Sequence, residues 1–159
     1  MISENYRIVP LIDPADHQVA GKDSPVIDIT GARKVTLVVL TGAMTAVQRV
    51  TVKVGTASNA VTTDLFAADE TVHVKRTNAD IDAANGDLLT NDVALESGQK
   101  YWQLLTNNKR MYVQEINGAR LAGWKYLRVN LNASGTEEFT AAIAIIETRY
   151  SPAEAMAVA

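Results

Sequence analysis

Alternation of apolar and polar residues along the chain predicts several short β-strands. In QRVTVKV, residues 48–54, valine occupies every second position from Val50 to Val54, and polar residues lie between. WKYLRVNL, residues 124–131, alternates in the same way. Successive side chains of a strand point to opposite faces, so each segment predicts a strand with one wet face. KVTLVVL, residues 34–40, is apolar on both faces, which is typical of a central strand.

The last apolar segment, FTAAIAIIETRY, residues 139–150, is also apolar on both faces, and we expect a central strand or one that a partner covers. Ile143 and Ile145 are assigned to the core, and Ala142 and Ala144 are expected to leave room for a close neighbour. The predicted core therefore comprises Val35, Leu37, Val50, Val52, Val54, Leu127, Val129, Leu131, Ile143 and Ile145.

Between these segments, YWQLLTNNKRMYVQEI, residues 101–116, predicts a β-hairpin. A turn at residues 107–108 places Leu104 opposite Met111 and gathers the apolar residues on one side. No long segment has helical periodicity, and turn signals separate the short strands. The pattern therefore predicts an all-β fold, an antiparallel, jelly-roll-like β-sandwich with N- and C-terminal arms.

The domain boundaries follow from the polar ends of the chain. Residues 1–25 are expected to form an N-terminal arm, residues 26–150 the β-sandwich domain, and residues 151–159 a C-terminal tail. Within the arm, RIVPLI is a candidate edge strand, because Pro10 cannot donate to a central ladder. At 159 residues and 47% hydrophobic, the chain can fold as one domain without disulfide or metal.

Composition and charge exclude several classes of function. Fifteen Lys and Arg against 18 Asp and Glu, with no basic run, argue against nucleic-acid binding. There is no cysteine, so disulfides and thiolate metal sites are excluded. The longest apolar runs are far shorter than the roughly 20 residues that span a bilayer, and the acidic, proline-containing N-terminus does not match a signal peptide. We expect a soluble protein, made in a cytoplasm, with neither nucleic acid nor membrane as partner.

Two polar segments are candidates for metal binding. Asp13, Asp16 and His17 lie together in DPADH, but Asx side chains favour such turns without a metal. DIDAANGDLLTND, residues 80–92, begins like a calcium loop and departs from the pattern at three ligand or glycine positions. A capped turn and a solvated loop are the preferred interpretations, and calcium or glycan binding by residues 76–100 stays an open alternative.

The sequence offers no recognisable catalytic set. The adjacent carboxylates Asp69-Glu70 and Glu137-Glu138 cannot face one substrate together, because neighbours on a strand point to opposite faces. No nucleophile elbow, phosphate loop or dinucleotide fingerprint occurs, and the two histidines are not at metal-binding spacing. We therefore predict no enzymatic activity, no catalytic residue, no cofactor and no metal.

Aromatic residues suggest one binding alternative. Trp102, Trp124 and Tyr126 could form a carbohydrate platform, although aromatics in strands pack into cores or interfaces more often. The core interpretation is preferred.

Three motifs resemble a known group of proteins: VIDITGARKVTLVVL, INGARLAGWKYLRV and AIAIIETRYSP. Together they are similar to small structural proteins from the morphogenesis clusters of tailed bacteriophages and prophages. Residues 55–100 depart most from the resemblance. It implies a virion component on the head surface: a capsid decoration or cement protein, a homotrimer whose partner is the major capsid protein, made in the bacterial host cytoplasm. A head-completion or neck protein and a carbohydrate-binding or adhesion module are the alternatives.

Overall fold

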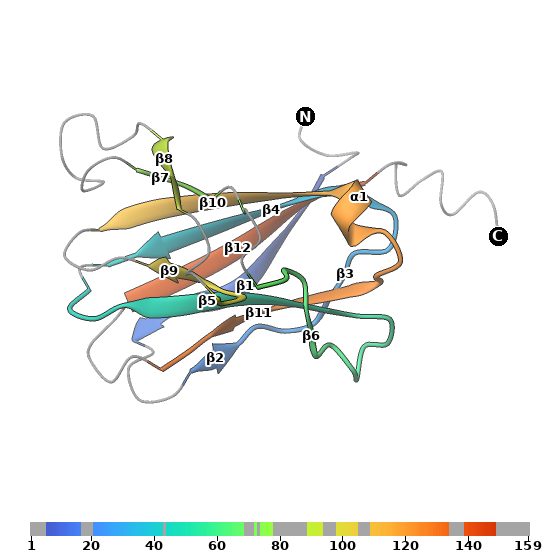
Figure 1. Ribbon diagram of the computed structural model, residues 1–159, viewed down its shortest axis with the longest axis horizontal. Coiled ribbons are helices and arrows are strands. Elements are labelled where there is room, and N and C mark those ends of the chain that lie inside the picture. The colour runs from blue at the N-terminus through green and yellow to red at the C-terminus, as the bar shows by residue number, and fades with distance from the viewer. Residues whose placement is uncertain are drawn as a thin grey trace.

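The chain folds as a sandwich of two antiparallel β-sheets (Figure 1). The computed structural model describes residues 6–16, 21–42, 44–68, 72, 74–77, 89–93, 98–104, 109–133 and 139–148. Only one helix, a single turn long, occurs among these residues. The prediction of an all-β sandwich is confirmed.

Sheet A has the strand order β1-β12-β4-β10-β7-β8, and sheet B has the order β2-β11-β5-β6, with β3 paired to β11 and β9 paired to β5. The strands of sheet A are β1 (Tyr6–Asp16), β4 (Ala32–Thr41), β7 (Val74–Thr77), β8 (Leu89–Val93), β10 (Arg110–Asn117) and β12 (Phe139–Thr148). The strands of sheet B are β2 (Lys22–Asp23), β3 (Ile27–Asp28), β5 (Gln48–Gly55), β6 (Thr63–Asp64), β9 (Trp102–Leu104) and β11 (Tyr126–Leu131).

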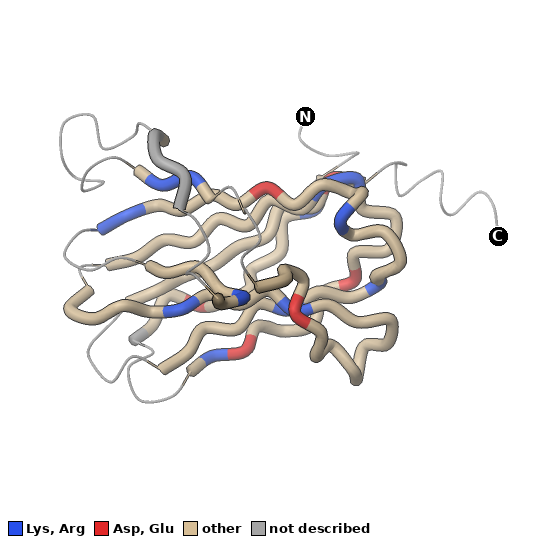
Figure 2. Tube along the Cα trace, in the orientation of Figure 1, with Lys and Arg blue, Asp and Glu red and all other residues tan. Residues whose placement is uncertain are grey.

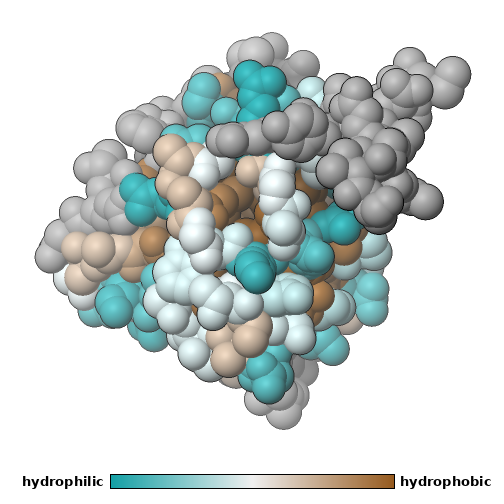
Figure 3. Space-filling model, turned by 90° about the vertical axis from the view of Figure 1, so that its right-hand side faces the viewer, coloured by the Kyte–Doolittle hydropathy of each residue, from teal (hydrophilic) through white to brown (hydrophobic). Residues whose placement is uncertain are grey.

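The core lies between the sheets, and all the predicted core residues on β4, β5 and β11 are buried in it. Figure 3 looks at the sandwich from one end, where apolar side chains are visible inside a frame of more polar residues. The assignment of β12 is wrong: Ile143 is 36% exposed and Ile145 is half-buried. Ala142, Ala144 and Ile146 face the core instead.

The predicted hairpin over residues 101–116 is wrong as well. β9 pairs with β5 in sheet B, whereas β10 lies between β4 and β7 in sheet A. Trp102 and Leu104 thus enter the core from one sheet, and Tyr112 and Ile116 enter it from the other. The apolar residues of both segments therefore meet in the core from opposite sheets. The sequence pattern alone cannot distinguish this arrangement from two paired strands of one hairpin.

The N-terminal segment is also part of the sandwich. β1 pairs with β12 along the edge of sheet A, as the edge-strand alternative for RIVPLI predicted, so residues 6–16 are not a separate arm. Register shifts follow Pro10 and Ile12, and Leu11 and Ile12 are both buried. A regular strand would place these two neighbouring side chains on opposite faces. The register shifts let both of them reach the core. The predicted tail, residues 151–159, lies outside the described residues.

One motif of the resemblance builds the crossing between the sheets. NGARLAG connects β10 in sheet A to β11 in sheet B through helix α1 (Gly118–Leu121). The Asn117 side chain caps this turn by accepting a hydrogen bond from the Arg120 N–H at 3.0 Å. A Cβ on Gly118 would lie 2.7 Å from the Arg33 carbonyl, and Gly123 has φ +87°. Both glycines are therefore required by the backbone path.

Candidate interaction surface

The outer side of sheet A carries a continuous set of apolar side chains, which we call the apolar face. Its members project from β1, β12, β4 and β10: Ile8, Pro10, Val38, Leu40, Met111, Val113, Ala141, Ile143 and Ile145. The strand register aligns them in rows across the sheet. One row runs from Pro10 through Ile143 and Val38 to Val113.

The apolar face is open to solvent in the single chain. Ile8 is 55% exposed and Leu40 is 43% exposed. Nine of the twelve positions where three rows cross the four strands are apolar. At ordinary strand and residue spacings these nine cover about 300 Å². The largest apolar patch on a typical monomer is of about this size and is often functional.

Charged residues border this face at one end and along β7, where the exposed Lys75 lies opposite Val113, and are absent from its middle. Among the described residues, 35–41 on β4 and 139–146 on β12 carry no charge (Figure 2). At the border, the Lys34 ammonium lies 3.0 Å from Glu115, and the Arg33 guanidinium lies 3.3 Å from Glu147. The hydrogen bond to Glu115 raises the pKa of Lys34 above its usual value.

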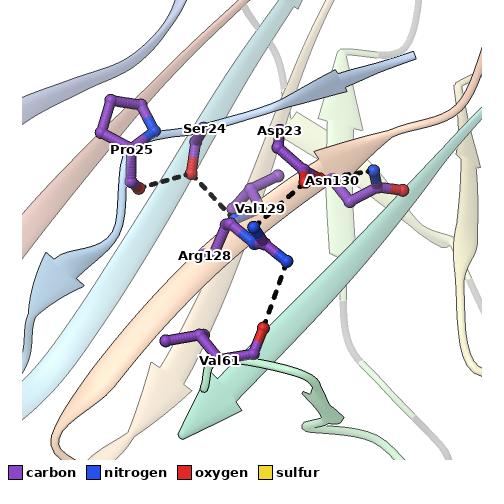
Figure 4. Close-up of polar contacts among 7 residues, drawn as sticks. All are labelled: Asp23, Ser24, Pro25, Val61, Arg128, Val129 and Asn130. Atoms are coloured by element: carbon purple, nitrogen blue, oxygen red, sulfur yellow. Dashed lines mark hydrogen bonds and ion pairs between the residues drawn. The ribbon is translucent and has the colours of Figure 1, made fainter. Parts of the chain in front are cut away.

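The outer side of sheet B is polar by contrast. Arg128 on β11 forms an ion pair with Asp23 on β2 at 3.1 Å, and its guanidinium donates to the Val61 carbonyl at 3.3 Å. Asn130 donates to the same Asp23 carboxylate at 2.7 Å (Figure 4). These contacts fasten β2 and the β5–β6 connection to β11. They explain the polar positions of WKYLRVNL as structural contacts of a sheet surface.

A second polar cluster joins the edge of sheet A to sheet B. Arg7 on β1 donates a hydrogen bond to the Asp28 carbonyl, and the Thr30 N–H donates to the Asp28 carboxylate at 2.8 Å. Partial burial raises the pKa of Asp28, but the hydrogen bonds from Thr30 and the nearby charges of Arg7 and Lys125 lower it more. The pKa therefore lies below the usual value.

The sequence-based metal candidates are not assembled into a site in the described part of the chain. No group of three or more His, Asp or Glu that could hold a metal occurs among these residues. Asp13 lies exposed on β1. The other candidates fall wholly or partly outside the described residues or side chains: Asp16, His17, Asp69, Glu70, His73, residues 78–88, Glu137 and Glu138.

The aromatic candidates do not form an exposed platform. Trp102 is 1% exposed and packs against Tyr112, with ring centroids 5.6 Å apart. Trp124 is partly buried and packs against the core, and Tyr126 is half-buried on β11. The preferred core interpretation is confirmed for Trp102. The apolar face was missed because the sequence pattern assigns Ile143 and Ile145 to the core. Its other members belong in that pattern to the predicted hairpin, to the N-terminal arm, or to the last strand and the second face of a central strand.

The described residues contain no helix long and apolar enough to cross a membrane. Searches found no matching family model and no matching curated protein.

Solved structures that match this chain include the SPBc2 prophage-derived protein YomS, at 9% identity and a TM-score of 0.45, over 89% of this chain and 91% of that chain. The K1 cleaved adhesin domain of Lys-gingipain from Porphyromonas gingivalis W83 matches at 13% identity and a TM-score of 0.38, over 91% and 90% of the two chains. The VP2 subviral particle of infectious bursal disease virus matches at 12% identity and a TM-score of 0.23, over 95% and 42%. At these levels of similarity, none of the three assigns a family or a function to this chain.

Proposed function

We propose that this chain is a structural protein of a tailed-phage virion, a decoration or cement protein that binds the outer surface of the assembled head. The observation that carries the proposal is the combination of a sandwich with an uncovered apolar face and the three motifs that resemble such proteins. No enzymatic role is part of the proposal.

The resembling motifs lie in the framework of the sandwich. They form β3 and β4, the α1 crossing with β11, and the edge-adjacent strand β12. A shared framework with a divergent stretch over residues 55–100 suits a family in which one fold is adapted to different capsids. We propose a homotrimer as the assembled form and the major capsid protein as the partner, after synthesis in the host cytoplasm.

The proposed role is a binding equilibrium. A protein that binds the assembled shell, and not its free subunits, stabilises the shell by mass action. An oligomer that contacts several capsid subunits at once gains avidity from many modest contacts. Neither mass action nor avidity requires a catalytic group.

The test is co-sedimentation of the purified protein with undecorated phage heads. We expect saturable binding to heads and none to free capsid protein at the same subunit concentration. A folded sample that fails to sediment with heads would contradict the proposal. Electron microscopy of virions labelled through this protein should place the label over the head, and label confined to the neck would support a head-completion role instead.

A further inference from the structure

We infer that the apolar face of sheet A is buried against a second copy of this chain. The inference takes from the proposed function only the expectation that the chain is a homo-oligomer. A face that packs on the same face of a second copy closes as a dimer, so the inference replaces the trimer by a dimer. It adds which surface forms the contact and which residues carry it.

The extent of the face fits such a contact. Stable interfaces bury roughly 800 Å² on each partner, and homodimer interfaces are about 65% apolar. The apolar face covers about 300 Å² as a flat area, so it supplies roughly half of the apolar part of one partner's share. The polar positions around it, including Thr36 and Asn117, are placed to form the rim.

The charges around the face permit contact between identical surfaces. Within the rows that begin at Ile8 and Pro10, the charged residue between β1 and β10 is Glu115, which pairs with Lys34 at 3.0 Å. Glu147 in the neighbouring row pairs with Arg33. Two copies can therefore meet in an arrangement that keeps these ion pairs and the exposed Lys75 at the rim of the contact, where like charges need not oppose one another.

The edge of the sheet is a poorer contact than its face. β1 is the outer strand of sheet A, where another chain could add a strand. Pro10 and Pro14 remove two N–H donors from this strand, and two register shifts interrupt its pairing. Face-to-face packing, at about 10 Å between sheets, is therefore favoured over extension of the sheet.

The test is the Ile143→Arg variant, with Thr51→Arg as matched control. Each places one arginine on the outer side of a strand, Ile143 in the apolar face and Thr51 on the polar side of sheet B. Light scattering after size exclusion should show the wild type and Thr51→Arg as dimers. Ile143→Arg should be a monomer with an unchanged circular dichroism spectrum, its association weakened about 100-fold or more.

A second variant, Leu40→Glu, covers the case in which Ile143→Arg does not fold, because Leu40 is 43% exposed. A wild type that is monomeric or trimeric at every concentration, or variants at both positions that keep the wild-type mass, would overturn the inference. A dimeric wild type that Ile143→Arg dissociates would support the inference and contradict the trimer. An oligomer that does not sediment with phage heads would refute the proposed function alone. A monomer that binds heads would refute the inference alone.

Discussion

A buried hydrogen bond between the sheets allows a sharp test of the fold. The Thr140 hydroxyl on β12 donates to the Gln48 side-chain oxygen on β5 at 2.8 Å, and the Gln48 amide donates to the Asn132 carbonyl at 3.2 Å. Gln48 is 0% exposed and Thr140 is 1% exposed. Water therefore has no ready access to either group when its partner is removed.

The perturbation is Thr140→Val, which keeps the branched shape and removes the hydroxyl donor. The Gln48 oxygen would then be buried without a partner, at a cost of about 1–3 kcal/mol. Gln48→Leu should cost a similar amount, because it leaves the buried Thr140 hydroxyl without its acceptor. The Asn132 carbonyl belongs to a half-buried residue, so water can replace its lost partner. The double variant should be less destabilised than the sum of the two, with a coupling of about 1–2 kcal/mol.

The assay is urea unfolding of the four proteins at one fixed concentration, since association would add to the apparent stability. Thr51→Val, on the outer side of β5, is the control and should change the stability by about 0.5 kcal/mol or less. The midpoint should shift with an unchanged slope. Strictly additive single effects, or a Thr140→Val effect no larger than the control, would refute the proposed bond across the interior.

Three further predictions concern packing, pH and the N-terminal strand. Leu127→Ala should cost about 2–5 kcal/mol, whereas Ile143→Ala should cost about 1 kcal/mol or less in the dissociated chain; equal losses on urea unfolding would contradict the observed faces of β12. Because the folded-state pKa of Asp28 is lowered, its carboxylate stabilises the fold above its unfolded pKa and the contribution is lost as the pH falls through the folded value. The Tm of the wild type should therefore fall more steeply below about pH 4 than that of Asp28→Asn, and parallel Tm curves would argue against this role. Deleting residues 1–16 removes β1 and uncovers the edge of β12, so size exclusion should show aggregated or unfolded protein, whereas a folded monodisperse product would show that β1 is dispensable.

The strands with one wet face were predictable from the sequence. On β5 and β11, valine and leucine alternate with polar residues, and the observed register pairs Val52 with Val129 and Lys53 with Arg128. A shift by one residue would have buried the charged side chains, so the pattern fixed which side faces the core.

Strand partners were less predictable than strands. The alternation in residues 102–104 and 110–116 predicts which side chains are buried. It does not predict whether the two strands belong to the same sheet. The Trp102 N–H donates to the Gln114 side-chain oxygen at 3.2 Å from the opposite sheet. In a sandwich, contact between two segments can thus mean facing positions rather than paired strands, and a short connecting loop does not decide between them.

The apolar face could not be predicted because β12 is apolar on both sides. Its orientation depends on neighbouring strands: Ala144 lies beside Leu37 and Val9, and Ala142 lies beside Val39. In the core, Leu37 and Val39 on β4 leave room beside them only for small side chains, so alanines of β12 face inward there. The larger Ile143 and Ile145 face out. Outward isoleucines contribute little to the folding of the isolated chain, which is the physical reason to expect a partner over this face.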